Sequence, residues 1–142
     1  DLARYLIGDK IQKVQAAAAS VSRGVCEDLT VSLNFAEGSL ATVAYTALGD
    51  TAYSKEMIES FAGGTVINID DFRGLTVTTA GKTVKQGRSR MQDKGHSAEL
   101  KSFVEAVVAG SQAPVDEAEI VESSFATIAI LESLQQGGPV IL

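Results

Sequence analysis

The sequence predicts an α+β domain: an open, predominantly antiparallel sheet of about six strands, with helices on one face and the other face available as an oligomer interface. From residue 28 the sequence changes to a period of two, with apolar and polar side chains alternating, which is typical of strands with one buried face. Short turns join the strands, and parallel neighbours would need long crossover connections. Helical spacing is confined to the two ends of the chain, which favours helices segregated to one side of the sheet.

A short helix is expected at residues 1–8, because three apolar side chains share one helical stripe before Gly8 ends it. These side chains are Leu2, Tyr5 and Leu6. A strand is expected next at residues 11–17, although the alanine run at residues 16–19 suits a helix equally well. The chain begins at Asp1 without an initiator methionine or a leader, so it is interpreted as a piece of a longer protein.

Strict alternation predicts a strand at residues 29–35, and the turn at residues 36–39 reverses the chain into a second strand at residues 40–47. The remaining strands are expected in segments that end at glycine-containing or aspartate-containing turns. They cover residues 55–61, 65–70, 75–79 and 83–86.

Two helices follow the strands. The first is expected to begin with Ser97 as its N-cap and to end at Gly110. For the second, Asp116 and Glu119 form an acidic variant of the capping box, and the apolar stripe stops at Gly137.

The outward face of the predicted sheet is rich in small neutral side chains, where a solvated face would be rich in lysine and glutamate. The set comprises Thr30, Ser32, Asn34, Thr42, Ala44, Thr46, Thr76 and Thr78. We interpret this face as an interface between copies of the chain; the alternative is an ordinary exposed face with many hydroxyl groups.

The composition is that of one globular domain: 142 residues, of which 45% are hydrophobic and 21% charged, which excludes disordered and membrane classes. The net charge is −6, and residues 95–142 carry seven acids against the one base Lys101. Such a chain lacks the basic stripe that binds phosphates, so nucleic acid is not expected as a partner. Cys26 cannot form an internal disulfide, which favours a reducing compartment such as the cytoplasm. One cysteine and one histidine supply too few ligands for a structural zinc site.

No dinucleotide fingerprint, phosphate-binding loop or nucleophile elbow occurs, so the chain contains no recognisable set of catalytic or cofactor-binding residues. Candidate ligand contacts lie in the polar stretch at residues 49–55, between two strands, where sheets commonly meet small molecules. The hydroxyl of Tyr53 and the ammonium of Lys55, with Asp50 beside them, suit a polyhydroxylated or carboxylated ligand. The alternative is an exposed loop with solvated charges.

His96 is a further candidate, because it stands at the start of a helix, where it could orient a substrate hydroxyl; alternatively, its imidazole is bonded to a nearby carbonyl. A run of basic residues could hold a phosphate or carboxylate. More commonly, such a run lies on a solvated edge strand, where the charges prevent aggregation. This basic run contains Lys82, Lys85, Arg88, Arg90 and Lys94. Cys26 is interpreted as an inert thiol. Four acids are assigned to the N-terminus or the solvent-exposed face of the last helix. These are Glu117, Glu119, Glu122 and Glu132.

The chain as a whole resembles the C-terminal half of the glucose–fructose oxidoreductase/inositol dehydrogenase (Gfo/Idh/MocA) family. The resemblance rests on the order and spacing of several short segments. They are DLARYLIG at residues 1–8, FAEGSLA at 35–41, ESFAGG at 59–64, DDFR at 70–73, KGHSAEL at 94–100 and AILESL at 129–134.

The resemblance implies that residues 1–142 are a C-terminal substrate-binding and oligomerisation domain, whose partner is an N-terminal Rossmann domain that binds NAD or NADP. Family members move a hydride between the nicotinamide and a sugar, inositol or related hydroxyl compound. Their acid/base histidine lies just before the position of Asp1 and their lysine lies in the Rossmann half, so neither is present. By resemblance, Tyr53 falls where some relatives place a substrate contact and His96 at the pocket edge. The alternative function is a non-catalytic interaction or regulatory module.

Overall fold

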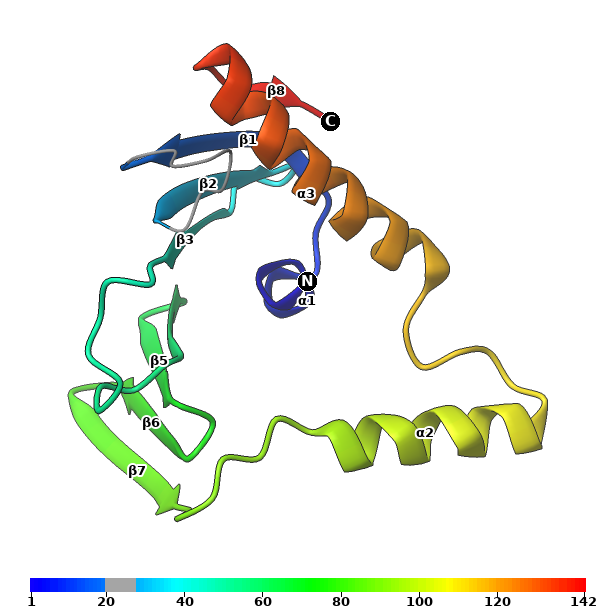
Figure 1. Ribbon diagram of the computed structural model, residues 1–142. Helices are drawn as coiled ribbons and strands as arrows, with labels where there is room; N and C mark the ends of the chain where they lie inside the picture. Colours follow the sequence, from blue (N-terminus) through cyan, green and yellow to red (C-terminus); the bar gives the residue numbers. More distant parts are fainter. Residues whose placement is uncertain (20–27) are drawn as a thin grey trace. The chain divides into compact units, whose positions relative to one another are not determined.

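The computed structural model describes residues 1–19 and 28–142, so Cys26 lies outside the described residues. The chain divides into two compact units (Figure 1), one formed by residues 1–48 and 113–142 and the other by residues 49–112. Each unit contains one antiparallel sheet. Within the described residues no helix is long and apolar enough to cross a bilayer.

The sheet of the first unit has the order β3-β2-β1-β8. Its strands are β1 (Ile11–Ala18), β2 (Leu29–Phe35), β3 (Leu40–Tyr45) and β8 (Val140–Ile141). All three pairings are antiparallel, and the turn between β2 and β3 is the one predicted for residues 36–39. The strand β8 has no counterpart in the sequence analysis.

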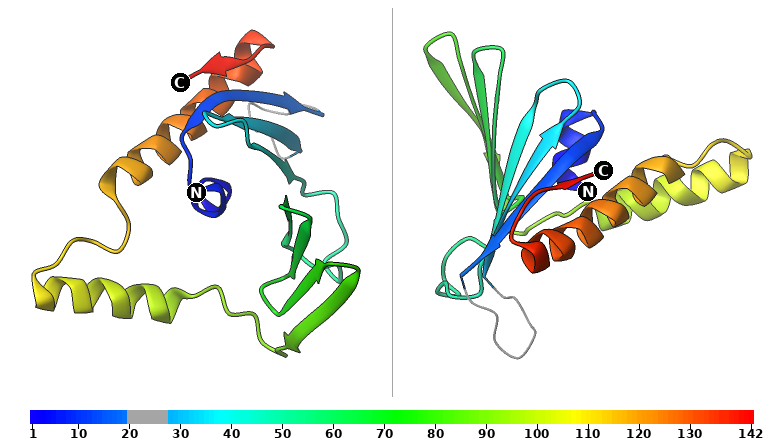
Figure 2. Two further views of the ribbon diagram at one scale, coloured as in Figure 1. Left: turned by 180° about the vertical axis from the view of Figure 1, so that it is seen from behind. Right: turned by 90° about the horizontal axis from the view of Figure 1, so that it is seen from above.

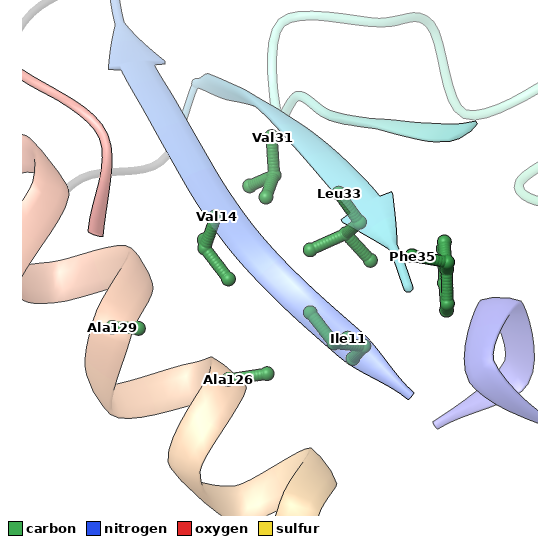
Figure 3. Close-up of a cluster of buried hydrophobic side chains, with 7 residues drawn as sticks. All are labelled: Ile11, Val14, Val31, Leu33, Phe35, Ala126 and Ala129. Carbon is green, nitrogen blue, oxygen red and sulfur yellow. The ribbon is translucent and has the colours of Figure 1, made fainter. Parts of the chain in front are cut away.

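Alternation along β2 creates the core of this unit. Val31, Leu33 and Phe35 are buried, whereas Thr30 and Ser32 on the opposite face are exposed. The other core side chains come from β1 and from the helix α3 (Glu117–Gln136), as Figure 3 shows. They are Ile11, Val14, Ala126 and Ala129.

Two helices cover the same face of this sheet, as predicted. The helix α3 lies alongside β1 in Figures 1 and 2 and contacts it through small side chains, which allow helix and sheet to approach closely. The helix α1 (Leu2–Ile7) packs Ala3 and Ile7 against the core and ends at Gly8, whose φ of 71° favours glycine.

The N-terminus of α3 is capped by Asp116, whose side chain accepts a hydrogen bond from the amide of Ala118 at 2.9 Å. Glu119, which a capping box would direct back toward the helix start, instead pairs with Arg4 of α1 at 2.8 Å. The assignment of Glu122 to the solvent-exposed face is corrected too: its carboxylate accepts from Arg4 and from the amide of Ile11. The two acids therefore connect α3 to α1 and β1.

The buried hydroxyl of Ser133 fixes the C-terminal half of α3. Ser133 is fully buried; its Oγ donates to the carbonyl of Gly138 at 2.6 Å and accepts from the amide of Ala16 at 2.9 Å. The side chain thus satisfies one backbone group on β1 and another on the turn that leads to β8.

The sheet of the second unit has the order β4-β5-β6-β7, again antiparallel. Its strands are β4 (Met57–Ala62), β5 (Thr65–Asp70), β6 (Gly74–Thr79) and β7 (Lys82–Arg88). The basic run thus falls on the edge strand β7 and on the segment that follows it, as the edge-strand interpretation expects.

The helix α2 (His96–Ala109) completes the second unit. It ends at Gly110 as predicted, but it begins after Gly95, so the expected cap Ser97 lies inside the helix. None of its residues is buried. Its apolar side chains, which share a helical stripe, are exposed: Leu100, Phe103, Val104, Val107 and Val108.

The α+β class and the open antiparallel arrangement are confirmed. Within residues 1–19 and 28–142 the strands number eight and form two sheets of four, where the sequence suggested a single sheet of about six. Of the neutral outward set, Thr42, Ala44 and Thr46 are exposed, whereas Thr76 and Thr78 are half-buried.

Candidate functional site

The predicted ligand loop precedes β4. Asp50 forms a tight turn there: its Oδ1 accepts from the amide of Ala52 at 2.8 Å and its carbonyl accepts from the amide of Tyr53 at 3.0 Å. Tyr53 is 69% exposed, and its hydroxyl donates to the sulfur of Met57 at 3.3 Å. Lys55 is exposed. A thioether is a weak acceptor, so the Tyr53 hydroxyl can turn to a ligand oxygen at small cost.

His96 is the first residue of α2, and it is exposed. Gly95 before it has a φ of 82°, and the amide of Gly95 donates to Oδ1 of Asp93 at 2.9 Å. The helix start has no side-chain cap, so no capping side chain accepts from its first amide groups. All four predicted site residues thus belong to the second unit.

The turn between β5 and β6 brings a buried carboxylate to the same unit. Asp71 and Phe72 have φ values of 52° and 51°, and the amide of Arg73 donates to the carbonyl of Asp70 at 2.9 Å. Two consecutive positive φ angles are typical of a type I′ hairpin turn. Asp71 is 8% exposed, and its carboxylate contacts Nε of Arg73 at 3.2 Å and Nε2 of Gln92 at 3.0 Å.

Further polar contacts join the ligand loop, this turn and the start of α2 at the end of the sheet where β4 and β6 begin. Ser54 Oγ donates to Oδ1 of Asp70 at 2.7 Å, and Nζ of Lys94 lies 2.7 Å from Oε1 of Glu56. The amide of Asp71 donates to the carbonyl of Glu56 at 2.7 Å. We call this set of side chains the sheet-end cluster. Its members are Ser54, Glu56, Asp70, Asp71, Gln92 and Lys94.

The sheet-end cluster places the predicted site residues at one end of one sheet. Ser54 and Glu56 flank Lys55 in the chain, and Lys94 lies two residues before His96. Among the described residues, no hydrogen bond or ion pair joins His96 directly to Asp50, Tyr53 or Lys55, so His96 is connected to the ligand loop only through the contacts of the cluster.

The cluster determines which groups remain for a ligand. Both oxygens of the Asp71 carboxylate are engaged, by Arg73 and Gln92, and Oε1 of Glu56 is engaged by Lys94, whereas the buried Oε2 of Glu56 has no hydrogen-bond partner among the described residues. Tyr53 and Lys55 can then donate to hydroxyl or carboxylate oxygens, while the imidazole of His96 can donate or accept. Within the described residues there is no group of histidine, cysteine and acidic side chains that could hold a metal ion.

Sequence reasoning did not identify Glu56, Asp71 or Gln92. Gln92 lies 21 residues from its partner Asp71, and Lys94 lies 38 residues from Glu56, so no local pattern marks these pairs. The one available signal was DDFR between two strand patterns, which marks the turn but not its contacts.

A separate open depression of about 520 Å³ lies in the first unit and is lined by Lys13, Asn34 and Ile141 among others. None of the predicted site residues lines it.

Comparison with known proteins gives no matching family model and no matching curated protein. Solved structures do match. An aldose-aldose oxidoreductase from Caulobacter crescentus, complexed with glycerol, is 18% identical with a TM-score of 0.80, covering 99% of this chain and 44% of that one. A UDP-N-acetylglucosamine 3-dehydrogenase from Acidithiobacillus ferrooxidans is 14% identical with a TM-score of 0.81, covering 95% of this chain and 44% of that one.

A levoglucosan dehydrogenase in complex with NADH and levoglucosan is 21% identical with a TM-score of 0.76, covering 100% of this chain and 47% of that one. The chain therefore spans less than half the length of the structures it matches. At these identities the similarity shows the fold. The chain therefore has the fold of the matched part of these oxidoreductase structures.

Proposed function

We propose that this chain is the substrate-binding and oligomerisation domain of a cytoplasmic NAD(P)-dependent oxidoreductase. The whole protein would move a hydride between the nicotinamide and a carbon atom of a sugar, inositol or related hydroxyl compound. One observation carries the proposal: oxidoreductase structures match almost all of this chain over only 44–47% of their own length. In this proposal residues 1–142 are the C-terminal domain, and Asp50, Tyr53, Lys55 and His96 contact the substrate.

The cofactor would be held by the other domain of the whole protein. A dinucleotide is commonly bound by a glycine-rich turn between a strand and a helix, and no such fingerprint occurs here. The residues of this chain therefore do not fit NAD or NADP. The role left to this chain is to bind and orient the hydroxyl compound.

Calorimetric titration of the 142-residue chain with NAD and with NADP is expected to show no binding, because the chain lacks a pyrophosphate-binding turn. The whole protein is expected to bind one of the two and to reduce it in the presence of sugars or polyols, measured by absorbance of the reduced nicotinamide. Micromolar affinity of the isolated chain for either dinucleotide would contradict this division of labour.

The outward face of the first sheet supports self-association. Thr30 pairs with Ala44 and Ser32 with Thr42 across β2 and β3, and all four side chains are exposed. A neutral surface of this kind can be buried against a second copy without the cost of desolvating charges. In the proposal this face is the homo-oligomer interface.

Light scattering of the whole protein is expected to give a dimer or larger assembly, and Thr42→Arg is expected to shift it toward the monomer by placing charges in the interface. The matched control is Gln135→Arg, which adds the same charge at an exposed position of α3. A monomer at high protein concentration, without any substitution, would refute the interface.

The second candidate function is a non-catalytic interaction module that pairs through the same neutral face. Dinucleotide binding and reduction by the whole protein, as described above, separate the two candidates. A whole protein that associates through Thr42 but neither binds nor reduces a dinucleotide would favour the module.

A further inference from the structure

The start of α2 is attached to its sheet by polar contacts. None of the helix residues is buried, and residues 89–95, which connect β7 to α2, form no helix or strand. Among the described residues, two side-chain contacts link this connection to the sheet end: Gln92 to Asp71 and Lys94 to Glu56. Two backbone bonds accompany them: the amide of Ser89, directly after β7, donates to the carbonyl of Arg73 at 2.8 Å, and the amide of Asp93, nearer to His96, donates to the carbonyl of Phe72 at 3.5 Å. The position of His96 therefore depends on these contacts.

The Asp71–Gln92 contact is the more strongly anchored of the two. Asp71 is 8% exposed and sits at a φ of 52°, a conformation that aspartate tolerates better than most residues. Its amide is bonded to the carbonyl of Glu56 and its second carboxylate oxygen to Arg73, so its Oδ1 has a fixed direction toward Gln92. A hydrogen bond to a charged, largely buried group is stronger than an exposed neutral one.

The Glu56–Lys94 ion pair holds the part of the connection that lies closest to His96. Its side chains are 39% and 35% exposed, so its contribution to stability is small. Its place is informative, however, because Glu56 follows Lys55 and Lys94 lies two residues before His96. The pair thus joins the two segments that carry the predicted ligand contacts.

We propose that the Asp71–Gln92 and Glu56–Lys94 contacts form a clasp that holds His96 in a fixed position relative to Tyr53 and Lys55. Gln92 and Lys94 are then positioning residues of the ligand site, with Asp71 and Glu56 as their anchors. The clasp as a restraint on α2 stands on the geometry above, and its effect on ligand binding rests on the proposed function. A preorganised site binds more tightly because less freedom is lost when the ligand arrives.

The test uses the double variant Gln92→Ala/Lys94→Met in the 142-residue chain and in the whole protein. In the chain, ¹⁵N relaxation at His96 and Ser97 is expected to give order parameters of about 0.85 before substitution and below about 0.6 after it. In the whole protein, KM for the hydroxyl substrate is expected to rise about tenfold with kcat within about twofold, because ground-state and transition-state binding are lost together.

The matched control is Gln86→Ala/Lys82→Met, which makes the same chemical changes at exposed positions of the edge strand β7 and is expected to change neither readout. Lys94→Arg keeps the ion pair and is expected to retain the parent KM. Tyr53→Phe in the whole protein tests the ligand loop by itself.

Unchanged order parameters in the double variant would overturn the clasp. A KM that rises in Tyr53→Phe but not in the double variant would overturn its positioning role. If Tyr53→Phe has no effect while the order parameters fall, the proposed ligand site is wrong and the clasp stands as a restraint on α2.

Discussion

Glu122→Ala is expected to lower the free energy of unfolding of the first unit by about 2–4 kcal/mol. The carboxylate of Glu122 accepts from Nε of Arg4 at 3.2 Å and from the amide of Ile11 at 2.5 Å. The side chains of Glu122 and Arg4 are only 19% and 13% exposed. Alanine at position 122 would leave a largely buried guanidinium and a buried amide without this acceptor. Glu119, whose side chain is 37% exposed, compensates only in part.

Urea denaturation, followed by NMR at amides of β1 and β2, measures this effect. The free energy of unfolding of Glu122→Gln should lie between those of the parent and of Glu122→Ala, because the glutamine amide oxygen can still accept from Ile11 while the charge opposite Arg4 is lost. Glu132→Ala is the control: it removes the same group from an exposed position of the same helix and is expected to change stability by less than about 0.5 kcal/mol. Equal effects at positions 122 and 132 would refute the bridging role.

The strands of the second unit were largely predictable because their signals are local. The segments around β5 and β6 end at turns that need positive φ, and the turn at Asp71 and Phe72 adopts it. The strand β8 was missed because two residues carry no periodicity, and it exists only through its pairing with Lys13 and Val14 of β1. The division into two sheets also depends on which strands pair, and alternation along one strand cannot determine that.

The distinction between local signals and long-range contacts applies to side chains as well. Asp116 was recognisable as a cap because its partner is two residues away. In the sequence, Glu122 cannot be distinguished from a solvated acid on the surface of a helix. Its bridging role follows only from its contacts with Arg4 and Ile11, which are more than 100 residues distant in sequence. Among site residues, the loop with Tyr53 was visible as a polar interruption between strands, whereas the contact of Gln92 with Asp71 follows from the tertiary fold alone.

Phe35→Ala is expected to lower the free energy of unfolding of the first unit by about 3–5 kcal/mol, at least as much as Glu122→Ala. Phe35 is 2% exposed and packs in the cluster of Figure 3. The side chains that α3 contributes to this cluster are the alanines Ala126 and Ala129, which are too short to fill the space that the ring would vacate, so a cavity should remain.

Phe61→Ala is the matched control for this substitution. Phe61 also lies in a strand, β4, but is 71% exposed, so its removal should cost less than about 1 kcal/mol. Both changes delete the same ring from a strand, so the difference between them isolates burial from the intrinsic preference of phenylalanine for β structure. Amide-resolved urea denaturation gives both values, and similar losses at the two positions would refute the core assigned to the first unit.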